Sequence, residues 1–95
     1  MAPRGRSLGG WPEWWNWDLE LTSHLRKRMF DRRFTEIELR EMLQRASVCY
    51  PDFMEGRWVI ASRLGGHPWL VIVEPDEAVK VLVVITAYPV TRRRR

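Results

Sequence analysis

The sequence predicts an α+β domain in which two N-terminal helices pack on one face of an antiparallel sheet of three to four strands. The first observation is a change of period. Apolar side chains recur every three or four positions in the first half of the chain, and every second position from Arg57 onward. The second observation is that short turns separate the later segments, which favours an antiparallel meander. Helices that precede such a sheet bury their apolar stripes against it.

Two helices are predicted from their capping signals and their apolar stripes. The first is expected to start at Asp18, a residue type that caps helix N-termini, and to run to about Arg32. For the second helix, Thr35 and Glu38 have the spacing of a capping box. Its buried face is predicted to consist of Leu39, Met42, Leu43 and Ala46. Its exposed face carries the i,i+4 pairs Glu36–Arg40 and Glu41–Arg45.

Three strands follow in the second half of the chain. They are predicted over residues 57–63, 69–74 and 79–88, separated by a Gly-Gly turn and by a Pro-Asp-Glu turn. A further short strand within 47–53 would give the sheet four strands. The last strand is apolar on both faces, so we expect both to be covered.

The composition indicates one small domain with an addition at each end. We expect a flexible Trp-rich arm over 1–17, a compact domain over 18–90 and a disordered arginine tail over 91–95. No apolar run is long enough to span a bilayer and no secretory signal is present, so a cytoplasmic location is expected. The single Cys49 is expected to be a small buried or half-buried residue, and no spacing of Cys and His predicts a metal site.

The net charge of +4 is unevenly distributed along the chain. Six of the sixteen basic residues lie in the two tails, which leaves ten basic against twelve acidic residues elsewhere. The body is therefore slightly acidic, apart from a local basic cluster formed by Arg26, Lys27, Arg28, Arg32 and Arg33. The arginine tail could contact a polyanion such as RNA, or could simply be solvated.

Four of the six tryptophans lie between residues 11 and 17. One interpretation is that Trp14 and Trp17 close the open end of the core. The other is an exposed arm in which Trp11, Trp14 and Trp15 bind a partner protein or stack on bases. The sequence leaves both open.

The first helix carries an unusual polar stripe. His24, Arg28 and Arg32 recur every four residues, next to the apolar residues through which the helix must dock. Such groups are costly to desolvate unless they are paired or used. They could pair with carboxylates such as Asp31 or Glu74, or they could form a site.

The last strand offers partners for this stripe. Alternation predicts that Thr86 and Tyr88 share a face with Leu82 and Val84, where the first helix could bring His24 and Arg28 to them. Imidazole, guanidinium, hydroxyl and phenol groups suit cleavage of a phosphodiester without a metal. Arg63 and His67 flank the Gly-Gly turn and could reach the same end of the sheet to bind substrate.

These residues also carry a family resemblance. The stretches Leu21-Thr22-Ser23-His24-Leu25-Arg26-Lys27-Arg28-Met29, Asp31-Arg32-Arg33-Phe34-Thr35-Glu36 and Val84-Ile85-Thr86-Ala87-Tyr88-Pro89 resemble the domain-of-unknown-function family 4258. The chain is more distantly similar to BrnT-type and RelE-type toxins. The resemblance implies a ribonuclease-toxin-like fold, RNA as substrate, an antitoxin as partner and no cofactor. It implies His24, Arg28, Thr86 and Tyr88 as catalytic residues and Arg32 as a contributor. Arg33 stands where relatives commonly have Gly.

The first hypothesis is therefore a metal-independent endoribonuclease of toxin–antitoxin type that produces a 2′,3′-cyclic phosphate. The alternative is a non-catalytic module that keeps the toxin-like fold and binds a protein or nucleic acid through its tryptophans and its arginine tail. A third option is a dimer whose tryptophans bury each other across a two-fold axis.

Overall fold

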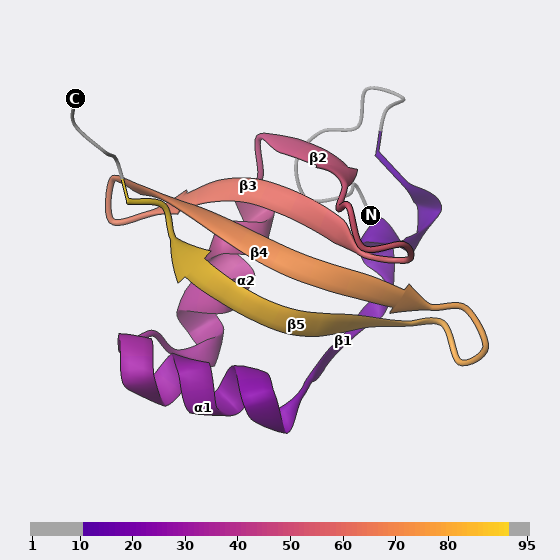
Figure 1. The fold of residues 1–95 in the computed structure, drawn as a ribbon, viewed down its shortest axis with the longest axis horizontal. Coiled ribbons are helices and arrows are strands. Elements are labelled where there is room, and N and C mark those ends of the chain that lie inside the picture. Colours follow the sequence, from indigo (N-terminus) through magenta and orange to yellow (C-terminus); the bar gives the residue numbers. More distant parts are fainter. Residues whose placement is uncertain (1–10, 92–95) are drawn as a thin grey trace.

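A five-stranded mixed sheet and two α-helices make up the part of the chain that the computed structural model describes, residues 11–91. Figure 1 shows α2 passing behind the sheet and α1 beside strand β5. The elements in chain order are the 3₁₀-helix η1 (Glu13–Asn16), β1 (Asp18–Leu21), α1 (Ser23–Arg32), α2 (Glu36–Gln44), β2 (Val48–Pro51), β3 (Trp58–Leu64), β4 (His67–Asp76) and β5 (Val81–Pro89).

The sheet has the strand order β1-β5-β4-β3-β2. Strands β2 to β5 form the predicted antiparallel meander, and β2 confirms the further short strand predicted within residues 47–53. The prediction of three to four antiparallel strands is wrong in one respect, because β1 adds a fifth strand that runs parallel to β5. The α+β class is confirmed.

Strand β1 replaces the expected start of the first helix. Asp18 is not an N-cap, since it pairs with Val81 as the first residue of β1. Leu19 and Leu21 alternate with charged residues and are half-buried, which is the period of a strand and not of a helix. The cap is Thr22, whose Oγ1 accepts a hydrogen bond of 2.9 Å from the backbone N–H of Leu25.

Helix α2 forms as predicted. The Thr35 hydroxyl accepts from the N–H of Glu38, and the Glu38 carboxylate accepts from the N–H of Thr35, so the capping box is confirmed. Both predicted i,i+4 ion pairs are present on its exposed face. Leu39, Met42 and Leu43 are buried, whereas Ala46, also predicted for this face, lies beyond the end of α2 and is half-buried.

The corner between α1 and α2 is built on a left-handed residue that is not glycine. Arg33 has φ 57° and ψ 50°, and its N–H caps the carbonyl oxygens of Met29 and Phe30. A Cβ in this conformation costs about 1–2 kcal/mol, which explains why glycine is the usual residue at such a helix end.

Replacing Arg33 with glycine is therefore expected to stabilise the domain by about 1 kcal/mol, after the greater entropy of glycine in the unfolded chain is allowed for. Urea unfolding of the full chain measures this change. Arg33→Ala is the matched control: it removes the charge but keeps the Cβ, so it should give no comparable gain. An equal gain in unfolding free energy in both variants would assign the effect to loss of the charge. It would contradict backbone strain at Arg33.

The tryptophan segment belongs to the core. Trp14 is 6% exposed and Trp15 is 1% exposed, within one apolar cluster that includes residues of both helices and of the inner sheet face. Trp11 packs on Trp15, with ring centroids 4.5 Å apart, and Trp14 packs on Trp58 at 5.5 Å. The expected flexible arm is thus corrected for residues 11–17, which belong to the folded domain. Residues 1–10 and 92–95, where the rest of the arm and most of the arginine tail fall, lie outside the described residues.

Candidate functional site

Helix α1 is attached to strand β5 at both ends. At the start of the helix, the Thr22 hydroxyl donates to the carbonyl oxygen of Val84 over 3.4 Å. At its end, Nη1 of Arg32 donates to the carbonyl oxygen of Ala87 over 3.0 Å. Strand β1 pairs with β5 only as far as Val84, so the helix takes over this edge where β1 stops.

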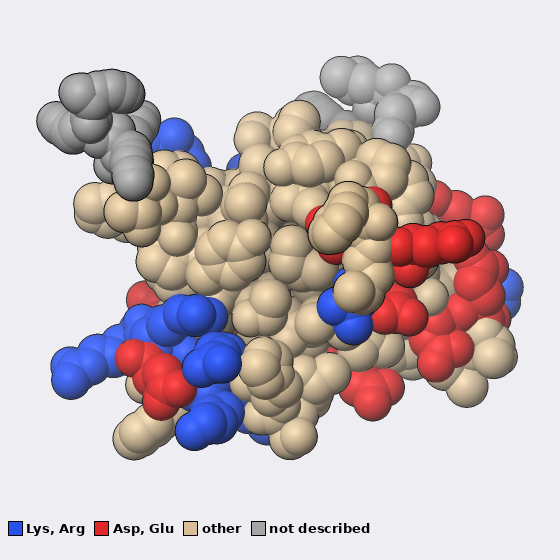
Figure 2. Space-filling view, in the orientation of Figure 1, with Lys and Arg blue, Asp and Glu red and all other residues tan. Residues whose placement is uncertain are grey.

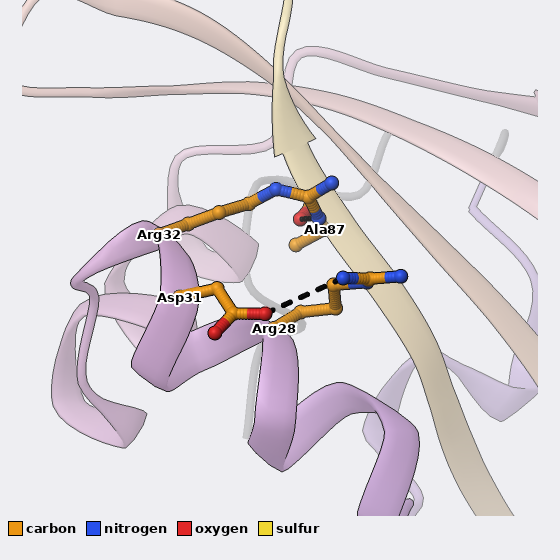
Figure 3. Close-up of polar contacts among 4 residues, drawn as sticks. All are labelled: Arg28, Asp31, Arg32 and Ala87. Atoms are coloured by element: carbon orange, nitrogen blue, oxygen red, sulfur yellow. Dashed lines mark hydrogen bonds and ion pairs between the residues drawn. The ribbon is translucent and has the colours of Figure 1, made fainter.

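The polar stripe of α1 follows this contact. Figure 3 shows Arg28 and Arg32 extending from α1 toward β5. Arg28 also forms a 3.4 Å ion pair with Asp31, one of the pairings that the sequence left open, and its side chain remains 35% exposed. His24 lies in the first turn of the helix and is exposed. The stripe therefore borders β5 from a position on the surface, where a ligand can reach it.

Thr86 and Tyr88 lie on the opposite face of the sheet from the one predicted. A β-bulge between Ile72 and Val73 shifts the register, so that Val84 pairs with Val73 while Thr86 pairs with Ile72. The extra residue reverses the alternation of β5 from that point on. Val84 and Ala87 are fully buried. Thr86 and Tyr88 are half-buried on the face away from the core. The prediction that Thr86 and Tyr88 share a face with Leu82 and Val84 is therefore wrong.

The Arg32 end of the stripe lies beside this segment of β5. Ala87, the residue to which Arg32 is bonded, stands between Thr86 and Tyr88. The bond thus joins the Arg32 end of the stripe to the segment of β5 that carries Thr86 and Tyr88, whereas His24 lies at the other end of α1. The bond gives Arg32 a positioning role that sequence reasoning missed, because the sequence does not reveal which carbonyl is left unpaired at a strand edge.

Arg63 and His67 lie at the same end of the sheet as this site. The register pairs Leu64 with His67 and Trp69 with Pro89, so the β3–β4 turn is beside the end of β5. Both side chains are exposed, and Arg63 donates to the carbonyl oxygen of Gly66 over 3.0 Å. They stay candidates for substrate binding.

The charges near the site are mostly basic and unpaired. Figure 2 shows lysine and arginine side chains gathered at one end of the molecule, around α1. Of the basic cluster, only Arg28 has a carboxylate partner among residues 11–91. Arg26, Lys27, Arg32 and Arg33 are therefore available to attract an anion. Within the same described range, no group of three or more His, Cys, Asp or Glu residues is placed to hold a metal ion.

The hollow at the α1–α2 corner is a separate feature. It has a volume of about 620 Å³ and does not include the four candidate catalytic residues. Its lining residues are Met29, Phe30, Asp31, Arg33, Phe34 and Thr35. The candidate site is thus a surface at a strand edge and not this hollow.

Cys49 is not suited to nucleophilic chemistry. Burial raises the pKa of its thiol to about 11. Because only the thiolate reacts, alkylation of Cys49 by iodoacetamide near pH 8 is expected to be about 100-fold slower than that of a cysteine with the ordinary pKa of 9.0. Mass spectrometry of the native chain gives the rate, with the urea-unfolded chain as reference. Equal rates in the two states would contradict the raised pKa.

The Trp11, Trp14 and Trp15 side chains do not form an exposed binding surface. Trp14 and Trp15 are buried, so their assignment to partner binding is wrong for this fold, and the two-fold packing of tryptophans loses its basis. Trp11 is half-buried against Trp15. The interpretation that the tryptophans close the core is the one that the structure supports.

The fold and the site define a small α+β domain with a basic helix beside the last strand of its sheet. The chain belongs to the family described as Domain of unknown function (DUF4258), whose model matches residues 21–89. The match runs from the last residue of β1 to the end of β5 and includes every candidate catalytic residue. No curated protein and no solved structure matches the chain. Neither described helix has the length and apolar content needed to cross a membrane.

Proposed function

We propose that this protein is a cytoplasmic, toxin-like endoribonuclease that cleaves RNA without a metal and is neutralised by an antitoxin protein. The observation that carries the proposal is the hydrogen bond from Arg32 to Ala87. It fixes the C-terminal end of α1 beside the part of β5 that carries Thr86 and Tyr88, and Arg28 extends from the helix toward the same strand. In this proposal, His24 and Arg28 of α1 and Thr86 and Tyr88 of β5 supply complementary proton-transfer and anion-binding chemistry to one substrate bound at this edge.

The chemistry assigned to these groups is an internal transesterification. The ribose 2′-oxygen attacks the adjacent phosphorus, the bond to the 5′-oxygen breaks, and a 2′,3′-cyclic phosphate results. His24 takes the proton of the 2′-hydroxyl or supplies one to the leaving 5′-oxygen. Arg28 donates to the phosphoryl oxygens as negative charge develops on them. Thr86 and Tyr88 orient the phosphate, and Tyr88 can assist proton transfer.

The surrounding charge supports RNA as the substrate class. The unpaired cations of α1, together with Arg63 and His67, lie at the end of the sheet where β5 finishes. Phosphate contacts of this kind are sensitive to salt, so binding is expected to weaken as ionic strength rises.

The test is cleavage of a single-stranded RNA by the full chain in the presence of EDTA. We expect cleaved RNA with 2′,3′-cyclic phosphate ends, and no cleavage of a DNA strand of the same sequence, which lacks the attacking 2′-hydroxyl. His24→Ala protein purified in parallel controls for contaminating ribonuclease. Cleavage of the DNA strand, or equal cleavage by the His24→Ala preparation, would refute the proposal.

A non-catalytic interaction module is the second candidate function. The observation in its favour is the exposed apolar face of the sheet, on which Val48 is 42% and Tyr50 is 45% exposed. In this second candidate function the tryptophans do not bind the partner, since they belong to the core. Absence of cleavage on every RNA tested, combined with association through this face, would favour the module.

A further inference from the structure

The sheet has one face that no helix of the described chain covers. We call it the outer face, and its residues are predominantly apolar. By register its uncharged members include Val48, Tyr50, Val59, Ala61, Leu70, Ile72, Val83, Thr86 and Tyr88, and Arg63 and Glu74 share the same face toward its two ends. The opposite face contributes Ile60, Val71, Val73 and Val84 to the core. Val59 and Ile72 at its centre are only 5% and 8% exposed, whereas Val48 and Tyr50 on its β2 edge are 42% and 45% exposed. An apolar edge of this kind is costly to leave in water and marks an interaction site.

The outer face lies between two ends of opposite charge. Figure 2 shows basic side chains gathered at one end of the molecule and acidic side chains at the other. The basic end is where β5 finishes beside α1, and it also carries Arg63. The acidic end is where β5 begins, and it carries Glu20, Asp76 and Glu77 together with Glu74, which is ion-paired with Arg57. A partner that covers the apolar face must therefore present acidic groups at one end and basic groups at the other.

We propose that the outer face binds a second copy of this chain, face to face and with the strands reversed. A two-fold axis that crosses the strands places the basic end of each copy on the acidic end of the other. Strand β1 and helix α1 occupy the same edge of β5 at its two ends, so this rotation sets Glu20 of one copy near the α1 cations of the other. A two-fold axis along the strands would instead join like charges, which opposes association.

The second copy meets the requirements of this surface better than a polyanion does. A nucleic acid would be attracted by the basic end but repelled by the acidic end, and apart from Thr86 and Tyr88 the centre of the face is apolar and offers it no phosphate contacts. Two identical copies satisfy the charges at both ends and bury the same apolar residues twice, as an isologous interface requires.

The assembly also has a consequence for the proposed function. Thr86 and Tyr88 belong to the outer face, so the dimer shields them from substrate. This step rests on the proposed RNA cleavage and predicts that activity per chain falls as the protein is concentrated into the dimer. The dimer itself is measured without RNA, so failure of the cleavage proposal and failure of the dimer proposal are distinguishable.

The experiment is sedimentation equilibrium of the full chain over a range of concentrations. We expect a monomer–dimer equilibrium that Tyr50→Lys and Leu70→Lys each weaken at least tenfold, because each places an unpaired charge in an apolar interface. Ile37→Lys is the matched control: Ile37 is 77% exposed on α2, away from the outer face, and its substitution should leave the dissociation constant unchanged. Circular dichroism checks that each variant folds, and Tyr50→Lys is at an exposed position that tolerates the change.

The reversed arrangement has its own test. Glu20→Lys should weaken the dimer, and adding Lys27→Glu to the same chain should restore association by re-forming complementary ends. A wild-type chain that stays monomeric at every concentration would overturn the proposal. So would a dimer that tolerates both outer-face lysines, and a double variant that associates no better than Glu20→Lys would overturn the reversed orientation.

Discussion

Replacing Trp15 with alanine is expected to destabilise the domain by about 3–5 kcal/mol, the usual cost of removing a buried large aromatic side chain. Trp15 is 1% exposed and lies between Trp11 and Trp14, with ring centroids 4.5 and 6.0 Å away. Its removal leaves a cavity where η1 closes the core. A domain of this size is stable by about 5–15 kcal/mol, so the variant should lose a large part of its stability.

Urea unfolding of the full chain measures this loss. Trp11→Ala is the matched control, because Trp11 is only half-buried and its removal should cost clearly less. If Trp15→Ala does not fold, Trp15→Phe keeps most of the apolar volume and should show a smaller loss in the same assay. A loss below about 1 kcal/mol for Trp15→Ala would mean that the segment is not part of the core, as the flexible-arm interpretation requires.

Replacing His24 with alanine is expected to lower the rate of RNA cleavage by about 10²–10⁴-fold, the range that a positioned acid or base contributes. Arg28→Ala should lower it by about 10²–10³-fold, because the charge on the phosphoryl oxygens loses its donor. His24 is exposed and Arg28 has only an exposed ion pair with Asp31, so neither change should alter the fold.

Single-turnover cleavage of one RNA oligonucleotide gives these rates. Ser23→Ala, an exposed position in the same turn of α1, controls for effects of mutating the helix, and Arg40→Ala on α2 controls for loss of an arginine. Both controls should cleave at the wild-type rate. If the His24→Ala variant and the Arg28→Ala variant both cleave at the wild-type rate, this mechanism is excluded.

Local signals in the sequence predicted the elements that depend on neighbouring residues. The capping box of α2, its ion pairs and the meander from β2 to β5 follow from spacings of a few positions. Strand β1 was mistaken for helix because its pairing with β5 is non-local, and the apolar pattern of four residues is too short to separate the two periods. Propensity cannot reveal a partner that lies far along the chain.

The site was predicted in its residue types but not in its geometry. Arg32, the last residue of the polar stripe on α1, is bonded to β5. The predicted face of Thr86 and Tyr88 is wrong because one bulged residue reverses the alternation of β5. No glycine in the strand indicates that bulge in the sequence. The crowding of the tryptophans in the sequence suggested an arm, yet Trp14 and Trp15 are buried in a core that distant strands complete, and Trp14 packs on Trp58 of β3.

The pairing of β1 with β5 determines when this chain can fold during its synthesis. Asp18 is bonded in register with Val81, so the first strand has no partner until almost the whole domain has left the ribosome. Trp14 and Trp15, which precede β1, can be fully buried only after β5 has been synthesised, because β5 completes the core in which they pack. Sheet closure between such distant segments is slow relative to local contacts. The nascent chain therefore exposes its most aromatic segment for the full time of translation, and that is the interval in which a chaperone would act on it.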